Sequence, residues 1–277
     1  MSLDRRLMQR LPKLLLLLLF TFVYAYPLFM LLSFSLKNNG SMYANPLGLS
    51  GEFHWGNYSE AWSRSNFDVA LWNSVTITFI SALLILLIGS MAAYPLARRK
   101  GKGATLLQGF FVAGLIVPMQ LNLIPLFKLL HSLGLSRTPL GVIFLYIAFG
   151  MPLTVFLFSG FIRSLPKELE EAARIDGCSG AGIFFRIVLP LMKPIGTTVF
   201  ILQFLTIWND FFLPVVFLNT EKLKTVQIAV YSFVGQYAND WSHMFPMIVL
   251  SVAPVLALYV FLQKYIIAGI MSGAVKG

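Results

Sequence analysis

Long apolar runs alternate with short polar segments along the whole of this sequence. Six of the runs approach the ~20 residues that an α-helix needs to cross the hydrocarbon core of a bilayer. Few charged residues interrupt them. The pattern therefore predicts an all-α integral membrane protein with six transmembrane helices. The expected spans are residues 14–36, 71–97, 105–127, 140–162, 195–218 and 245–267.

The first apolar run follows a cluster of basic residues, a pattern that signal peptides share. It is longer than the roughly 7–15 apolar residues of a signal-peptide core, and no small-x-small cleavage site follows Tyr24-Ala25-Tyr26. We therefore expect a retained helix. Together with the first external loop, this helix forms an expected N-terminal part at residues 1–70, ahead of a membrane core at residues 71–277.

The most charged segment lies between the fourth and fifth predicted spans, at residues 163–194. Each charge at the centre of the hydrocarbon core costs roughly 2.5–3.5 kcal/mol or more, so this segment must be a loop in water. Its charged residues are Arg163, Lys167, Glu168, Glu170, Glu171, Arg174, Asp176, Arg186 and Lys193.

The pattern within this loop predicts two short helices joined by a glycine. Pro166 suits the first position of a helix, where its missing N–H is not needed. Acidic residues then fill the first turn, where the helix dipole favours negative charge. Gly177 can end the helix in the left-handed conformation, and Pro190 is expected to stop the second piece. Ala172 and Ala173 have short side chains on the apolar edge of this helix, so another protein surface could approach closely.

These positions resemble the EAA loop of binding-protein-dependent ABC importer permeases. The resemblance implies that the loop forms coupling helices, which dock into a cleft on a cytoplasmic ATPase subunit, and that Glu170 and Asp176 belong to the same surface. An ordinary amphipathic cytosolic loop is the alternative; it explains the charge but not the spacing. The residues that fill the pattern are Glu171, Ala172, Ala173, Gly177, Ile187, Leu189 and Pro190.

Composition agrees with a membrane protein. Hydrophobic residues make up 57% of the chain, and charged residues only 12% against a usual ~25%. The net charge of +10 lies in short loops beside the spans, so it predicts membrane topology and no nucleic-acid partner. Lys and Arg are densest before the first span, after the second and in the 163–194 loop, so both termini and this loop are expected in the cytoplasm. Cys178, the only cysteine, lies in that loop.

The last residues carry a second resemblance. Gly273, Val275, Lys276 and Gly277 match the Gly-x-Val-Lys-Gly tail of the shorter permease subunit of maltose-type carbohydrate importers. The resemblance implies that this tail, expected at residues 268–277, reaches into the interface of the ATPase dimer. It also implies a place in the cytoplasmic (inner) membrane of a bacterium.

Polar residues inside spans are candidates for function, because hydrocarbon penalises them. Trp208, Asn209 and Asp210 lie in the fifth span, and this stretch resembles sugar permeases. Asp210 is the only charged residue deep within a span; lining the substrate path and packing within the bundle remain equal alternatives for it. Gln120 and Asn122 lie in the third span between two prolines. They could satisfy backbone carbonyls that the prolines free, or they could offer neutral amides to sugar hydroxyls.

The sequence thus resembles a permease subunit that performs no covalent chemistry. No phosphate-binding Gly-rich loop and no metal-ligand spacing occur, so no cofactor is expected in this chain. The resemblance implies ATP and Mg²⁺ on two partner ATPase subunits, a second homologous permease, and an external binding protein that delivers the substrate.

Two other functions remain open at this point. An ABC permease for a polyamine, phosphate or amino acid would share the EAA loop, although the tail and the Trp208–Asp210 stretch favour a sugar. A secondary transporter would be expected to show inverted repeats and broken helices around an ion site. No repeat is evident in the sequence.

Overall fold

The computed structural model describes residues 2–45, 52–218, 220–234 and 240–274. Within these ranges the regular structure is helical, without a strand, so the predicted all-α class is confirmed. The chain divides into two compact units. Unit 1 comprises residues 1–67 and 229–254, and unit 2 comprises residues 68–228 and 255–277. The expected N-terminal part ended at residue 70, close to the first division, but unit 1 also takes in residues 229–254.

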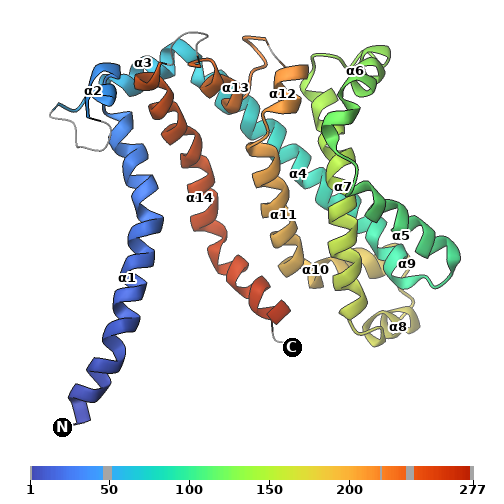
Figure 1. The fold of residues 1–277 in the computed structure, drawn as a ribbon. Helices are drawn as coiled ribbons and strands as arrows, with labels where there is room; N and C mark the ends of the chain where they lie inside the picture. The colour runs from blue at the N-terminus through green and yellow to red at the C-terminus, as the bar shows by residue number, and fades with distance from the viewer. Residues whose placement is uncertain (1, 46–51, 219, 235–239, 275–277) are drawn as a thin grey trace. The chain divides into compact units, whose positions relative to one another are not determined.

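Unit 1 contains α1 (Ser2–Ser35), α2 (Asn39–Ala44), α3 (Gly56–Ser65) and the beginning of α14 (Trp241–Ala274) (Figure 1). The side chains of residues 12–29 on α1 are all exposed, although most are apolar. A helix that is apolar on every side is stable in hydrocarbon rather than in water, which agrees with a membrane span.

A polar cluster joins α3 to the start of α14 within unit 1. His243 Nδ1 lies 2.6 Å from Asp240 Oδ2, and His243 Nε2 lies 3.2 Å from Glu60 Oε2. Arg64 lies 3.2 Å from Glu60 and 3.7 Å from Asp240. Burial acts to raise the pKa of Asp240, but hydrogen bonds from Ser242, His243 and Asn39 hold that pKa below its ordinary value. His243 lies in the first turn of α14.

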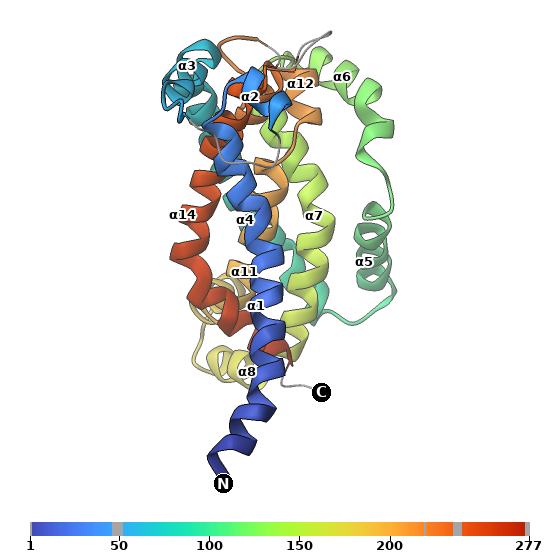
Figure 2. The ribbon, with the colours of Figure 1, turned by 60° about the vertical axis from the view of Figure 1, so that its left-hand side comes forward.

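Unit 2 is built around three long helices. They are α4 (Phe67–Arg98, in this unit from Asp68), α7 (Pro139–Ser164) and α11 (Lys193–Trp208), and α5 (Lys102–Gly114) packs beside α7 (Figure 2). Two glycines let these helices approach closely. A Cβ added at Gly89 would lie 2.4 Å from a Thr154 carbon, and one at Gly150 would lie 2.6 Å from an Ile85 carbon. Small residues at such crossings are typical of helix packing in membranes.

The described residues contain four helices that are long and apolar enough to cross a membrane, or up to six if two bent pairs are counted as spans. The predicted third span, residues 105–127, is one of these bent pairs. Here α5 ends at Gly114, and η1 (Met119–Asn122) and α6 (Leu123–Ser132) continue at 93° to it. Pro118 lacks the N–H that a continuous helix needs and disfavours helical backbone in the residue before it.

The predicted fifth span, residues 195–218, is also interrupted. Its main helix α11 ends at Trp208, and a short helix, α12 (Phe212–Phe217), follows after three residues. α13 (Val226–Tyr231) comes next in the chain. At its other end, α11 is bent by 75° from the preceding helical segment, Gly180–Leu191. The expected span 195–218 therefore consists of α11, a break of three residues and the short helix α12.

Candidate functional site: the 163–194 loop and the break after α11

The first helix of the loop is α8 (Glu168–Ile175), with three acidic residues in its first turn as predicted. Its C-terminal end is closed by Gly177 at φ +82°, where an L side chain would be strained. The N–H of Cys178 donates to the Ala173 carbonyl at 2.9 Å, and the N–H of Gly177 donates to the Arg174 carbonyl at 3.1 Å. This is a Schellman motif. Pro166, expected at the first helical position, instead lies two residues before the helix begins.

The second helical piece is α9 (Gly180–Ile183), followed by the π-helical turn η2 (Phe184–Val188) and α10 (Leu189–Leu191). The Ser179 hydroxyl caps its start by accepting the Gly182 N–H at 3.2 Å. Pro190 lies inside α10 rather than at its end, so the expectation that Pro190 stops this piece was wrong. The helix instead ends one residue later, at Leu191.

The two sides of α8 lie in different surroundings. Ala173 and Glu170, three residues apart and so on one face, are only 7% exposed. Glu171 and Ala172 are exposed, and Ile175 is 87% exposed. The apolar edge expected to face another protein is therefore divided. Its Ala173 side packs into this chain, and the outward side carries an apolar surface that includes Ile175.

Buried apolar residues fill the space behind Ala173. They come from the C-terminal ends of α4 and α7 and from the segment that begins with α9, and include Phe158, Ile162, Ile183, Phe184 and Val188. The second helical piece thus supports α8 from within unit 2. Figure 1 shows α8 and α9 at one end of α7, with α6 at the other.

A buried ion pair holds the Glu170 side of α8 against the end of α4. Arg98 Nε donates to Glu170 Oε1 at 2.7 Å, and the Tyr94 hydroxyl donates to Glu170 Oε2 at 2.8 Å. Arg98 also donates through its NH2 group to the Leu165 carbonyl at 3.1 Å. The side chains of Arg98 and Glu170 are 12% and 10% exposed. Glu170 is thus engaged within the chain, whereas Glu171 points to solvent.

The other residues expected on the coupling surface vary in exposure. Asp176 and Gly177 are exposed beside Ile175, and a Cβ at Gly177 would meet nothing within 4 Å. Ile187 and Leu189 are half-buried, and Pro190 is exposed. The loop therefore presents its first helix more fully than its second.

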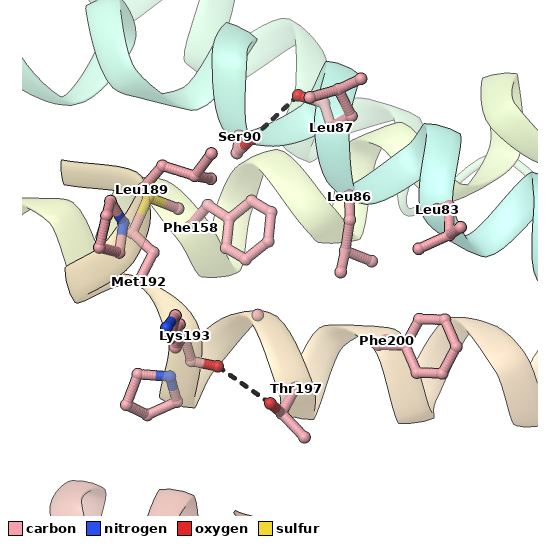
Figure 3. Close-up of a pocket in the computed structure, with 13 residues that line it drawn as sticks. Leu83, Leu86, Leu87, Ser90, Phe158, Leu189, Met192, Lys193, Thr197 and Phe200 are labelled. Atoms are coloured by element: carbon pink, nitrogen blue, oxygen red, sulfur yellow. Dashed lines mark hydrogen bonds between the residues drawn. The ribbon is translucent and has the colours of Figure 1, made fainter. Parts of the chain in front are cut away.

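Leu189 and Pro190 also line a groove of about 890 Å³ among α4, α7, α10 and α11 (Figure 3). Phe158 and Phe200 contribute aromatic walls, and Lys193 lies at the start of α11. The lining is almost entirely apolar, so the groove offers few hydrogen-bond partners to a polyol.

The break after α11 is organised by Asp210. Its carboxylate accepts the N–H groups of Phe212 and Leu213 at 3.0 and 3.3 Å, which caps α12, and it accepts the Tyr146 hydroxyl of α7 at 2.9 Å. A broken helix in a membrane leaves backbone groups that need such partners. The arrangement matches the packing alternative for Asp210. Trp208 is buried and Asn209 is exposed.

The two amides of the predicted third span lie in η1. Gln120 is exposed, and Asn122 Nδ2 donates to the Pro118 carbonyl at 3.4 Å, as expected for an amide that satisfies a carbonyl freed near a proline. Among the described residues, no hydrogen bond joins Gln120 or Asn122 to the Trp208–Asp210 stretch. The five residues expected on a substrate path therefore form two groups.

Sequence reasoning missed two features of unit 2. Gln203 is 5% exposed within α11 and donates to the Gly150 carbonyl at 3.3 Å and to Thr154 Oγ1 at 3.2 Å, joining α11 to α7. Ile175 was overlooked because its neighbours are charged, and because a single apolar residue in a polar stretch does not by itself indicate contact with a partner. Of the predicted tail, Gly273 lies in α14, and Val275, Lys276 and Gly277 lie outside the described residues.

This membrane fold and its loop define a transport permease. The chain belongs to the family described as the binding-protein-dependent transport system inner membrane component, whose model matches residues 85–272. The family resemblance inferred from the EAA loop is thereby confirmed.

Relatives named for sugar transport match nearly the whole chain. The melibiose/raffinose/stachyose import permease protein MelC of Bacillus subtilis is 42% identical over 91% of each chain. The diacetylchitobiose uptake system permease protein NgcG of Streptomyces coelicolor is 36% identical over 94% of this chain and 87% of its own. A chain of a bacterial ABC transporter for the acidic polysaccharide alginate shares the fold, with a TM-score of 0.78 at 22% identity, covering 95% of this chain and 97% of that one.

Proposed function

We propose that this chain is the membrane permease of an ATP-driven importer for a sugar or short oligosaccharide, which an extracytoplasmic binding protein delivers. The observation that carries the proposal is the 42% identity to a permease named for melibiose, raffinose and stachyose. Neutral amides and aromatic rings are suited to an uncharged polyol, and the one acid deep in a predicted span, Asp210, is engaged as a helix cap.

The proposed assembly contains a second, homologous permease and two ATPase subunits, which bind ATP and Mg²⁺. The chain itself performs no covalent chemistry. It lies in the cytoplasmic membrane of a bacterium with both termini inside, as the distribution of Lys and Arg favours.

We assign docking on the ATPase to the outward side of α8. This surface is apolar at Ile175, and the small residues Ala172 and Gly177 let a partner approach closely. Glu171 and Asp176 add charge at its rim. A protein interface commonly has this composition, with an apolar centre and a polar edge. In the proposed assembly the tail at 268–277 makes a second contact with the ATPase.

For the substrate path we propose two kinds of role. Asp210 and Trp208 maintain the break after α11. The exposed amide of Gln120 and the Oδ1 of Asn209, whose Nδ2 donates to the Leu205 carbonyl at 2.8 Å, are available to sugar hydroxyls. Asn122 supports the backbone near Pro118.

The test is transport by the whole complex in proteoliposomes. With the partner permease, the ATPase and the cognate binding protein present, ATP inside the vesicles should drive uptake of labelled raffinose or a related oligosaccharide, and ADP should not. Excess unlabelled sugar should compete, whereas an amino acid, a polyamine and phosphate should not. ATP-driven uptake of one of those three solutes without uptake of any sugar would overturn the substrate assignment.

A further inference from the structure

The guanidinium of Arg98 contacts the connection between α7 and α8 and also α8 itself. α7 ends at Ser164 and α8 begins at Glu168, so three residues form a hinge between them. Arg98 donates to the carbonyl of Leu165, the first hinge residue, and to the carboxylate of Glu170 in the first turn of α8. The same side chain therefore binds the start of the hinge and the helix that follows it.

Tyr94 adds a second contact from the same face of α4. It lies four residues before Arg98, one helical turn away, and its hydroxyl occupies the other oxygen of the Glu170 carboxylate at 2.8 Å. Both carboxylate oxygens are thus engaged by α4. This arrangement restricts rotation of α8 about the hinge more than a single contact would.

The chemistry of arginine suits this place. Its planar guanidinium carries donors in several directions, so it can serve a carbonyl and a carboxylate together, whereas a lysine ammonium is a point charge on a flexible stem. The pair is largely removed from water, which strengthens its attraction. Arg99, the next residue, is exposed and offers a matched comparison.

We propose that Arg98 is a positioning residue that makes α8 and the inner end of α4 move as one body. Displacement of α8 by the ATPase then reaches α4 directly, and the hinge at residues 165–167 does not absorb it. This inference rests on the proposed docking of α8. It adds a further route of transmission, because the covalent connections of α8 lead to α7 on one side and, through α9 and α10, to α11 on the other, but not to α4.

The test compares Arg98→Gln, Glu170→Gln and the double variant with Arg99→Gln, each in the complete transporter in proteoliposomes. The readout is the number of sugar molecules imported per ATP hydrolysed, measured beside the amount of ATPase that remains bound. Each single variant should retain the ATPase and lower this ratio about tenfold, and the double variant should fall no further, because both changes remove the same link. Arg99→Gln should stay within about twofold of wild type.

Arg98→Lys separates the charge from the double contact, because it keeps the first and loses the second. This variant should import less than half as much sugar per ATP hydrolysed as the wild type. If Arg98→Gln does not insert, Tyr94→Phe removes only a hydroxyl and should lower the ratio about threefold at unchanged protein level.

The proposal fails if Arg98→Gln, or Tyr94→Phe in its place, imports sugar per ATP at the wild-type ratio, or if the losses of the two single variants multiply. Loss of bound ATPase from inserted Arg98→Gln would also overturn it, because the residue would then act on docking itself. Failure of the docking proposal would give a different result. Ile175→Glu would then retain the bound ATPase, whatever the import ratio of the Arg98 variants.

Discussion

The inward and outward sides of α8 contain adjacent members of one motif in opposite surroundings. Ala173 packs among buried side chains of its own chain, and Ala172 beside it faces solvent. Glu170 is held by Arg98 and Tyr94, and Glu171 is exposed. A contiguous Glu-Glu-Ala-Ala sequence therefore serves two purposes. One side fixes the helix to the membrane core, and the other remains available for a partner.

The difference shows why spacing alone does not assign a role within such a loop. A helix places residues 170 and 173 on one face, and residues 171, 172 and 175 on others. Substitutions of the same kind at neighbouring positions should consequently have different effects.

Ala173→Asp should prevent accumulation of folded protein. It places a carboxylate among apolar side chains without a cation, which costs several kcal/mol and is comparable to the whole stability of a domain. The measurement is the amount of monodisperse permease recovered in mild detergent. Ala172→Asp is the matched control and should be recovered at the wild-type level. Equal recovery of the two variants would show that the two alanines do not differ as described.

Ala172→Asp should instead weaken association with the ATPase. A charge without a partner at the docking surface costs about 2–3 kcal/mol, which lowers the affinity roughly 30- to 150-fold. Co-purification with the ATPase at defined concentrations measures this loss. Full ATPase recovery with full sugar uptake would remove Ala172 from the docking surface.

Gly177→Ala should cost about 1 kcal/mol, because its φ of +82° is unfavourable for a side chain while the space around it is open. The apparent Tm of the permease should fall by about 2–4 °C. Gly180→Ala is the control: it also has open space, but no positive φ, and should leave the Tm unchanged or slightly higher. If both variants behave alike, backbone strain does not explain the need for Gly177.

Asp210→Asn should have the smallest effect of these substitutions. It tests the carboxylate at the break after α11, which can be compared with the carboxylate of Glu170. Both carboxylates accept a tyrosine hydroxyl, but the other partners of Asp210 in the described part of the chain are the backbone N–H groups of Phe212 and Leu213, and the oxygen of an asparagine can still accept from one of them. We expect a loss of stability of at most about 1 kcal/mol, with sugar uptake within about twofold of wild type. Uptake reduced tenfold or more at normal protein levels would instead place Asp210 on the substrate path.

Much of the architecture follows from local sequence signals. Apolar run length indicates the spans, and the acidic first turn and Gly177 predict α8 and its Schellman end. The interruption after Trp208 could not be predicted by hydropathy, because apolar residues continue on both sides of it. The 93° bend near Pro118 could not be predicted from the proline alone. Membrane helices accommodate many prolines without such a bend, as α7 accommodates Pro152.

The Arg98–Glu170 ion pair could not be predicted from the sequence, for a different reason. The two residues are 72 positions apart, and several bases and acids near the predicted inner ends of the spans could have paired in other ways. Only the packing of α4 beside α7 brings them together. The same holds for the separation of Glu170 from Glu171, which depends on the side of α8 that meets the core.

The central claim is that the outward side of α8 contacts the ATPase, and site-specific photocrosslinking tests it most directly. A photoreactive residue placed at Ile175 should form a covalent adduct with the ATPase in the assembled transporter. The same residue at Ser132, which is exposed on α6 at the other end of α7, should form none. Absence of an adduct from Ile175 in a complex that still transports sugar, or an equal adduct from Ser132, would contradict the account.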